Sequence, residues 1–415
     1  MLEIQKKISI DIRLFHTNYN LHSESNNMNE YCVSISKKHD LEIYLEKCDA
    51  KKFDNNIESR ARHFRYDKLK NICLSHNIKY VLTAHHQDDQ IETIYMAESN
   101  NSSWVSKIGI RDISFIDDKE SKVYLIRPML SISKKNIIKY ANQRKLKYYD
   151  DPTNLDLRFF RNKVRQDIQK KINDADFRAN YLNISNQSKD KISVISKCID
   201  NQFNNLIFFL KSKDLCILNK ELLIQNNFDF IFLFLKKILS DHFNFKENLS
   251  SNFWKSINKY IISNKSGTIF SISNNICISK NLNYLYIYKS KISETLKGST
   301  AIGNHFLRLG TLSVTKSNDY IYFDNKEGIT IPLNFSKDLN FSKWCYGDFC
   351  FSSNGNKLKV SDIYINNKLS LFHKNHYPIL KYLDKIIWIP NLYSSVSEAF
   401  ESFDKFLIIR WNANL

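Results

Sequence analysis

The sequence predicts an α/β domain with a parallel sheet, then a mainly helical middle domain and a β-rich C-terminal domain. Short apolar runs alternate with amphipathic helical patterns up to about residue 172, which is typical of a parallel sheet with crossover helices. Helical spacing of apolar residues then dominates to about residue 264, and short strands marked by glycines dominate from about residue 298. We therefore expect three domains, over residues 1–172, 173–295 and 296–415.

The N-terminal elements follow one another as strand and helix. We expect strands over residues 8–16, 41–45, 80–84 and 123–126. Helices are expected over residues 30–39, 54–76, 88–98 and 133–143, the last one capped by Ser133. Polar loops are expected over residues 17–29 and 150–154. In the middle domain, alternating strands are expected over residues 267–289.

The overall charge favours a polyanionic partner. The 415 residues carry a formal net charge of +18, so RNA or DNA comes first. A codon bias toward Lys, Asn and Ile is the alternative explanation. The eight cysteines form no C-x-x-C pair, which makes zinc and a disulfide framework unlikely choices. No apolar run approaches the length needed to span a bilayer, and the N-terminus lacks a signal-peptide core. We expect a soluble cytoplasmic protein that does not enter the membrane.

One stretch concentrates polar chemistry at the end of a predicted strand. Residues 83–93 read Thr-Ala-His-His-Gln-Asp-Asp-Gln-Ile-Glu-Thr. Asp89 and Glu92 are three positions apart, so on a helix they share a face. Such a pair can hold Mg²⁺ or a substrate ammonium group. The alternative is an ordinary polar first turn, in which Asp88 and Asp89 favour the positive end of the helix dipole.

Five motifs in one order resemble the tRNA(Ile)-lysidine synthases, which are PP-loop ATPases. Residues 84–93 resemble the second signature of that family. The other matching motifs are Glu58-x-x-Ala61-Arg62-x-x-Arg65-Tyr66, Arg127-Pro128-Met129-Leu130, Asp150-Asp151-x-x-Asn154 and Arg161-Asn162-x-x-Arg165. His16 and Asn18 lie where the family carries a His-x-Asn-His strand end. Residues 347–390 resemble the family's last domain. The resemblance implies a PP-loop (adenine nucleotide α-hydrolase-like) fold.

The resemblance also implies an activity. The family uses ATP with Mg²⁺ to adenylate C2 of the wobble cytidine, position 34, of tRNA(Ile) with a CAU anticodon. Free L-lysine then replaces the adenylate, which gives lysidine and changes decoding from AUG to AUA. This reaction needs cations around the triphosphate and carboxylates that orient lysine and accept its proton.

The implied roles fall on three groups of residues, none of which is expected to hold a metal by itself. The expected catalytic residues are Asp89, Glu92 and Arg165. The expected nucleotide-binding residues are His85, His86, Arg127 and Arg161. The expected substrate-binding residues are Arg62, Arg65, Asp88 and Asn162. Phosphates of tRNA are expected at Lys357, Lys359, Lys368 and Lys374, whereas Phe228–Phe234 is expected to be core. A homodimer is possible.

The chain departs from the family pattern in its glycines. PP-loop enzymes begin with a strand and a Ser-Gly-Gly-x-Asp-Ser loop, whose backbone amides approach pyrophosphate. This chain has no glycine before Gly109, so the first strand, loop and helix are expected to be missing. A misplaced start or frameshift, a decayed remnant, or a second polypeptide that completes the site would each explain this. We expect residues 1–415 to bind ATP poorly and to show no lysine-dependent pyrophosphate release.

Two other functions remain open. Another PP-loop activity on tRNA, such as thiolation, would need cysteines near the site, and no cysteine is expected at a strand end. A non-catalytic tRNA-binding protein is the alternative from a different class.

Overall fold

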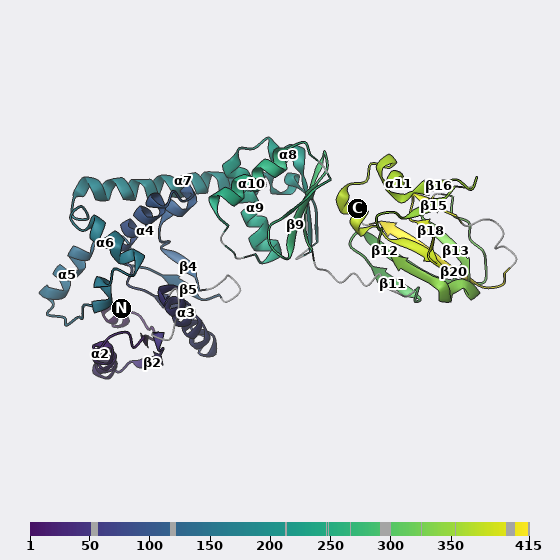
Figure 1. Cartoon of the computed structure of the whole chain (residues 1–415). Helices are drawn as coiled ribbons and strands as arrows, with labels where there is room; N and C mark the ends of the chain where they lie inside the picture. Colours follow the sequence, from purple (N-terminus) through teal and green to yellow (C-terminus); the bar gives the residue numbers. More distant parts are fainter. Residues whose placement is uncertain are drawn as a thin grey trace. The chain divides into compact units, whose positions relative to one another are not determined.

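The computed structural model (Figure 1) describes residues 1–50, 57–116, 122–211, 214–245, 247, 249–265, 267–290, 300–324, 326–352, 354–395 and 403–413. The chain divides into two compact units, Met1–Ser193 and Val194–Leu415. Within the described ranges, no helix combines the length and the apolar character that crossing a bilayer requires. The domain boundary predicted at residue 295 lies outside the described residues.

The strands of the first unit confirm the predicted parallel pairing and add an antiparallel edge. They are β1 (Arg13–Asn18), β2 (Glu42–Lys47), β3 (Tyr80–Leu82), β4 (Ile113–Phe115) and β5 (Tyr124–Ile126). Strands β1 and β2 pair in parallel, as do β3 and β5, whereas β4 is antiparallel to β5. The described strands thus form two sheets, with orders β1-β2 and β3-β5-β4. The first unit therefore has the carboxyl ends of parallel strands, which is where ligands bind in such sheets.

The helices of the first unit pack into two apolar clusters. They are α1 (Leu2–Gln5), α2 (Ser25–His39), α3 (Ile57–Ser75), α4 (Gln87–Ser99), η2 (Trp104–Ile108), α5 (Lys134–Gln143), η3 (Pro152–Leu155), α6 (Phe160–Ile168) and α7 (Ala175–Leu206). Leu69 of α3 packs with Leu125 of β5, and Phe15 of β1 joins this cluster. Ile91 of α4 packs with Val164 of α6 and Tyr181 of α7. Helix α4 is therefore held against α6 and α7.

Several predicted boundaries in this unit are wrong. The strand expected over residues 8–16 begins only at Arg13. The helix expected to begin at residue 30 begins at Ser25, inside the predicted polar loop. The start of the helix expected at residue 54 lies outside the described residues. Ser133 does cap α5, because its hydroxyl accepts a hydrogen bond from the amide of Asn136 at 3.3 Å.

The first part of the second unit is a five-stranded sheet with helices. Its strands are β6 (Ile207–Lys211), β7 (Leu215–Asn219), β8 (Ile269–Ser271), β9 (Ile276–Lys280) and β10 (Tyr284–Lys289), in the order β6-β7-β10-β9-β8. Its helices are α8 (Lys220–Ile224), α9 (Phe228–Phe243) and α10 (Ser251–Ile262). The expectation of helix throughout residues 173–264 is therefore wrong at β6 and β7. The apolar run at residues 228–234 is core from Phe230 to Phe234, as predicted, but the prediction is wrong for Phe228, which is 36% exposed.

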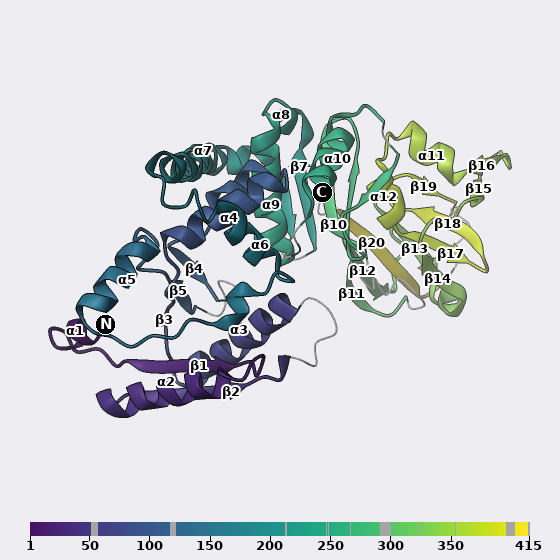
Figure 2. The same ribbon diagram turned by 60° about the vertical axis from the view of Figure 1, so that its left-hand side comes forward.

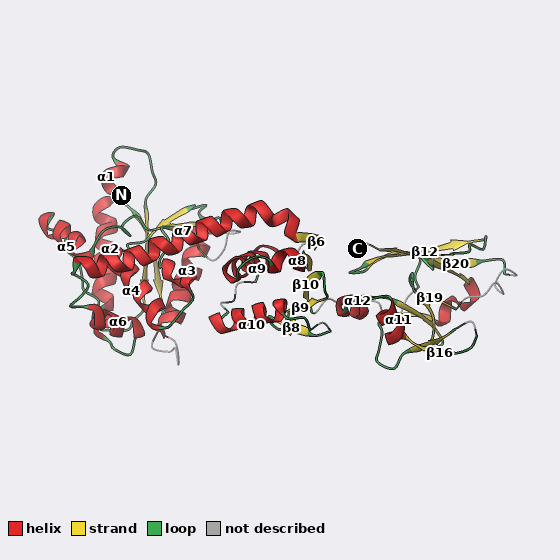
Figure 3. Cartoon of the chain, turned by 90° about the horizontal axis from the view of Figure 1, so that it is seen from above, coloured by secondary structure: helices red, strands yellow, loops and turns green. Residues whose placement is uncertain are grey.

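The C-terminal part is β-rich, as predicted (Figure 3). Its strands are β11 (Gly303–Phe306), β12 (Gly310–Ser317), β13 (Gly328–Pro332), β14 (Leu339–Ser342), β15 (Phe349–Phe351), β16 (Lys357–Lys359), β17 (Ile379–Tyr382), β18 (Lys385–Ile389), β19 (Tyr393–Ser394) and β20 (Phe406–Ala413). The helices are η4 (Leu333–Asp338), α11 (Val360–Asn366) and α12 (Leu371–His376). They surround a core that includes Trp388, which has no exposed surface.

Candidate active site

Helix α4 begins where the predicted motif follows β3. His86 is the N-cap residue, and its Nδ1 accepts a hydrogen bond from the amide of Asp89 at 3.3 Å. In return, Oδ2 of Asp89 accepts one from the amide of His86 at 3.0 Å. This reciprocal cap satisfies two helix-terminal amides. Through these two bonds His86 orients the start of α4.

Two carboxylates of α4 meet two arginines of α6. Arg161 donates from Nε to Glu92 at 2.7 Å and from Nη2 to Asp89 at 2.8 Å. Arg165 donates from Nε to the second oxygen of Glu92 at 2.8 Å, and its Nη2 lies 3.6 Å from Asp89. Asp89 and Glu92 are 8% and 5% exposed. The sequence motif therefore becomes a largely buried cluster of two negative and two positive charges, in which each carboxylate is neutralised.

The predicted acidic loop is tied to this cluster. Nη1 of Arg165 donates to Oδ1 of Asn154 at 2.8 Å. The buried amide of Asn162 donates to the carbonyl oxygens of Thr153 and Asp156, each at 2.8 Å. Asn162 thus fixes the 152–156 turn beside the arginines. This gives the residue a positioning contact, while its predicted contact with substrate stays a prediction.

Asp88 faces a different neighbour from Asp89. Its Oδ1 accepts a hydrogen bond from Nη2 of Arg178, on α7, at 2.8 Å, and one from the amide of Lys134 at 3.3 Å. These bonds join α4 to α7 and to the start of α5. Arg178 was missed from the sequence because it lies 90 residues from Asp88 and belongs to none of the five motifs.

His85 lies among cationic groups. Burial lowers the pKa of His85 to about 4; Asp89 acts in the opposite direction, and the charges of Arg127, Arg161 and Arg62 lower the pKa further. Arg127 directly follows β5, whereas Arg161 and Arg62 lie on α6 and α3, so three separate segments bring positive charge to the end of β3. A neutral His85 among arginines leaves the site with a positive potential that suits phosphate groups.

The remaining predicted arginines differ in accessibility. Arg127 is 8% exposed and donates from Nη1 to the carbonyl of Arg111 at 2.7 Å and to the hydroxyl of Ser114 at 3.1 Å. Through these two hydrogen bonds Arg127 links the end of β5 to β4. Arg62 and Arg65 both lie over the ring of Tyr66, with guanidinium carbons 4.8 and 5.2 Å from its centroid. Stacking leaves the in-plane N–H groups of Arg62 available for phosphate, whereas Arg65 also donates a hydrogen bond to the side chain of Tyr19.

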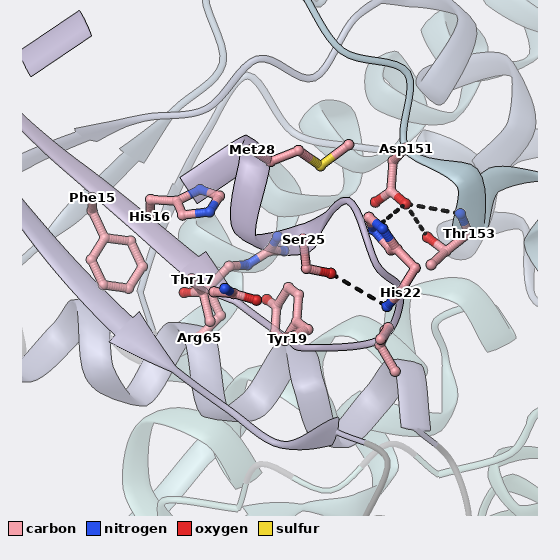
Figure 4. A pocket seen from close by; sticks show the side chains of 12 residues that line it. Phe15, His16, Thr17, Tyr19, His22, Ser25, Met28, Arg65, Asp151 and Thr153 are labelled. Atoms are coloured by element: carbon pink, nitrogen blue, oxygen red, sulfur yellow. Dashed lines mark hydrogen bonds and ion pairs between the residues drawn. The ribbon is translucent and has the colours of Figure 1, made fainter. Parts of the chain in front are cut away.

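A cavity of about 280 Å³ opens at the carboxyl end of β1 (Figure 4). Its lining includes His16, Thr17, Tyr19, His22 and Arg65, together with Asp151 and Thr153 of the acidic loop. The Thr17 hydroxyl and Nδ1 of His22 are buried without a hydrogen-bond partner. Unpaired buried polar atoms are costly. Both atoms are screened from solvent, although their residues line the cavity, and neither Thr17 nor His22 was predicted as a site residue.

The cysteines offer no obvious metal or thiol chemistry. Cys48 directly follows β2, so the expectation of no cysteine at a strand end is wrong. Burial raises its pKa, and Asp49 raises it further, which opposes the reactive thiolate form. In the part of the chain that the structure describes, no three His, Cys, Asp or Glu side chains are grouped to hold a metal.

Comparison with known families agrees with this geometry. The model of the PP-loop domain matches residues 1–172. The N-terminal part of this chain is a PP-loop domain. The whole site described above, apart from Arg178, lies inside the matched residues. The parallel strands, with polar residues beyond their carboxyl ends, are thus elements of this PP-loop domain.

Curated relatives extend the comparison beyond the PP-loop domain. A tRNA(Ile)-lysidine synthase of Mycoplasma mycoides is 29% identical over 295 residues, which are 68% of each chain. The enzyme of Persephonella marina is 34% identical over 39% of this chain and 34% of its own length. That of Campylobacter jejuni is 31% identical over 40% of this chain and 50% of its own length. The chain is thus similar to tRNA(Ile)-lysidine synthases; it spans 68% of the length of the first of these relatives and half or less of the other two.

Two solved structures are also similar in part. One, described as the crystal structure of the TILS C-terminal domain, covers 28% of this chain and 94% of its own, with 20% identity and a TM-score of 0.24. The U34-tRNA thiolase NcsA of Methanococcus maripaludis covers 46% of this chain and 66% of its own, with 15% identity and a TM-score of 0.36.

Proposed function

We propose that this protein is a tRNA-modifying enzyme that forms lysidine at position 34 of tRNA(Ile) with a CAU anticodon. The observation that carries the proposal is the cluster of Asp89, Glu92, Arg161 and Arg165 at the carboxyl end of β3, within a PP-loop domain. The tRNA and the lysine are taken from the relatives, which are tRNA(Ile)-lysidine synthases. The net charge of +18 supports an RNA substrate.

The cluster supports an exchange of ion pairs. In the structure the carboxylates are occupied by arginines, so neither is available to a lysine ammonium group. A triphosphate competes for guanidinium groups, because phosphate accepts the same paired N–H donors. When Arg161 and Arg165 turn to phosphate, Asp89 and Glu92 lose their partners and become an anionic site. An unpaired buried carboxylate is costly, so lysine then binds where the arginines were.

This exchange assigns a role to each group. Glu92 and Asp89 orient the lysine, and one of them takes the proton that its attacking amine loses. ATP would supply the adenylate that makes the C2 oxygen a leaving group. Arg165 and Arg161 stabilise the phosphate charge, with Arg62 and Arg65 serving phosphate of nucleotide or tRNA.

The cavity at the end of β1 fits a nucleobase better than a whole nucleotide. Its volume of about 280 Å³ lies at the small end of ligand pockets. Polar residues of its lining, such as Asp151 and Thr153, can bond a base edge, and Arg65 on the cavity wall can contact a phosphate. His85 and His86 orient this region rather than bind metal.

Residues that would hold Mg²⁺ are not evident. The two buried carboxylates of α4 are committed to arginines, and no other acidic group in the described ranges forms a cation site. The protein groups therefore do not fit a resident magnesium ion, and no step is assigned to one.

The test compares two proteins. One is residues 1–415, and the other carries a strand, a Ser-Gly-Gly-x-Asp-Ser loop and a helix from a tRNA(Ile)-lysidine synthase fused before Met1. Pyrophosphate release is measured with tRNA(Ile) transcript and ATP, with and without lysine. We expect lysine-dependent release from the fusion alone, because residues 1–415 have no glycine before Gly109. A fusion that folds and binds tRNA yet never responds to lysine would leave only the non-catalytic tRNA-binding function.

A further inference from the structure

Arg178, near the start of α7, binds the first turn of α4. Its Nη2 donates to Oδ1 of Asp88 at 2.8 Å and also to Oε1 of Gln87. Its Nη1 donates to the carbonyl oxygen of Ile172 at 2.8 Å. The side chains of Arg178 and Asp88 are 15% and 14% exposed. The guanidinium group thus joins two side chains of α4 to the segment that precedes α7.

The part of α7 that carries this arginine is itself held in place. Oδ1 of Asp174 accepts a hydrogen bond from the amide of Phe177 at 2.8 Å, which caps the start of the helix. The rings of Phe177 and Tyr181 lie 4.8 Å apart, and both residues pack in the apolar cluster that contains Ile91 of α4. Helix α4 lies beside α6 and α7 (Figure 2). The backbone that carries Arg178 is therefore held against α4.

A different arginine holds the other side of the same turn. Successive residues of a helix point about 100° apart, so Asp88 and Asp89 face different neighbours. Arg178 of α7 bonds Asp88, whereas Arg161 of α6 bonds Asp89 and Glu92. Two helices therefore hold the turn that leads into the carboxylate pair, each through its own arginine.

The proposed exchange of ion pairs releases only one of these two arginines. When phosphate draws Arg161 away, Arg178 still holds the turn, because its partners are not the carboxylates that lysine takes. Carboxylates that keep their place need no reorganisation when an ammonium group arrives. Arg178 also neutralises Asp88, which would otherwise compete with Asp89 for that ammonium group.

We propose that Arg178 is a positioning residue for the lysine substrate. It holds the first turn of α4 while the arginines of α6 turn to phosphate, so Asp89 and Glu92 stay in place to bind the ammonium group. Asp88, which the sequence predicts as a substrate-binding residue, serves as the partner of Arg178 instead. The inference rests on the proposed function for the identity of the substrate, and it adds a residue from beyond the matched PP-loop domain.

The first test is steady-state kinetics of the fusion that carries the Ser-Gly-Gly-x-Asp-Ser loop. For Arg178→Gln we expect the KM for lysine to rise about tenfold, because a displaced carboxylate pair binds the ammonium group less well. The KM for ATP should change by less than about twofold. Arg178→Lys should bring the KM for lysine back to within about threefold, because its ammonium group still pairs with Asp88. A merely structural role would lower kcat through a smaller folded fraction and leave the KM for lysine unchanged.

The second test uses residues 1–415 and measures no turnover. Hydrogen exchange of the α4 amides is compared for Arg178→Gln, Glu92→Gln and the double variant. Among the described hydrogen bonds, those of Arg178 and Glu92 have no partner in common, so independent effects on protection would multiply. If Arg178 positions Glu92, the loss of protection caused by Glu92→Gln should be at least about threefold smaller once Arg178 is replaced.

The matched control is Arg13→Gln, which removes a partly buried arginine of β1 that pairs with Asp11 at 2.8 Å and with Glu42 at 3.1 Å. Its effect on protection should multiply with that of Glu92→Gln, and the KM for lysine should not change. Multiplied effects of Arg178→Gln and Glu92→Gln, or a lower kcat with an unchanged KM for lysine, would overturn the proposal. A fusion that makes no lysidine would refute the proposed function, and the double-variant comparison in residues 1–415 would still show whether Arg178 positions the carboxylate.

Discussion

Nε of Arg161 donates to Oε2 of Glu92 at 2.7 Å and so joins α6 to α4 across 69 residues of sequence. The sequence predicted that both residues belong to the site, but not that they neutralise each other. Their pairing means that the carboxylate is occupied until something else takes the arginine.

Replacing Glu92 by Gln should destabilise the first unit locally. Arg161 and Arg165 would lose a partner that is 5% exposed, and breaking such a buried pair costs on the order of 3 kcal/mol. Hydrogen exchange of the α4 and α6 amides measures the change. The matched control is Glu42→Gln, whose carboxylate is 51% exposed and pairs with Arg13 at 3.1 Å; it should cost less than about 1 kcal/mol. Equal hydrogen-exchange protection of α4 and α6 in the Glu92 and Glu42 variants would contradict the burial of the ion pairs that Glu92 makes with Arg161 and Arg165.

Lysine should bind after the nucleotide. The ion-pair exchange requires phosphate to draw Arg161 and Arg165 away before Asp89 and Glu92 accept an ammonium group. In the fusion that carries the Ser-Gly-Gly-x-Asp-Ser loop, calorimetry should give at least tenfold tighter lysine binding with a non-hydrolysable ATP analogue than without it. Arg161→Lys should reduce that coupling, because a single ammonium cannot replace the planar fork. Lysine affinity that ignores the nucleotide would rule out the exchange.

Replacing Gly109 by Ala should destabilise the packing of η2 on α4. Gly109 has φ +75°, and an added Cβ would lie 2.6 Å from Oε1 of Gln90. That side chain cannot move away freely, because its Nε2 donates to the carbonyl of Ile108 at 2.9 Å and to Ser185. We expect a loss of about 2–4 kcal/mol in hydrogen exchange of α4, from strain and overpacking.

The control for that variant is Gly267→Ala. Gly267 has φ +82° but nothing within 4 Å of the added Cβ. Gly267→Ala should lower the free energy of unfolding by only about 1 kcal/mol, which is the cost of alanine at a positive φ. Similar losses at the two glycines would show that close approach to Gln90 contributes little.

The second unit should lose stability in mild acid. Burial and the charge of Arg308 lower the pKa of His376 to about 3 from 6.5, while Asp214 acts in the opposite direction. Nε2 of His376 lies 2.6 Å from Nη1 of Arg308, and its Nδ1 lies 2.7 Å from the carbonyl of Phe372. Above pH 6.5 both states are neutral. Below pH 6.5, His376 is protonated in the unfolded state but stays neutral in the folded state. The free energy of unfolding therefore falls until about pH 3.

At pH 4, we expect His376 to lower the free energy of unfolding by about 3 kcal/mol relative to its value at neutral pH. Urea unfolding of the full chain measures it through tryptophan fluorescence, because four of the five tryptophans lie in the second unit. His376→Gln should flatten the profile between pH 6.5 and 4 relative to the unmodified chain. Unchanged steepness would show that other groups control the acid response; His373, whose pKa burial lowers to about 4, is the first of these.

The sequence predicted those parts of the fold whose residue pattern within a single segment indicates a strand or a helix. The apolar run before Thr83 and the carboxylates after it marked β3 and α4 correctly. Strands β6 and β7 were missed because residues 207–219 continue the apolar spacing of α7. The two segments are strands because β7 pairs with β6 on one side and with β10 on the other. Helical and strand periodicities are not distinguishable over such short apolar runs.

The residues of the candidate site were also predictable only in part. Motifs of known residue types identified Asp89, Glu92, Arg161 and Arg165 without their mutual contacts. Thr17 and Arg178 carried no signal, because a threonine in a strand and an arginine on a long helix are ordinary in sequence. Their roles arise only when β1 opens onto a cavity and α7 reaches α4.

The most direct measurement is mass spectrometry of the nucleoside at position 34 after the fusion that carries the loop acts on tRNA(Ile) transcript with ATP and lysine. The account predicts the mass of lysidine in place of cytidine, and its loss when Glu92 is replaced by Gln. An unmodified cytidine from a folded, tRNA-binding fusion, or undiminished lysidine from the Glu92 variant, would contradict it.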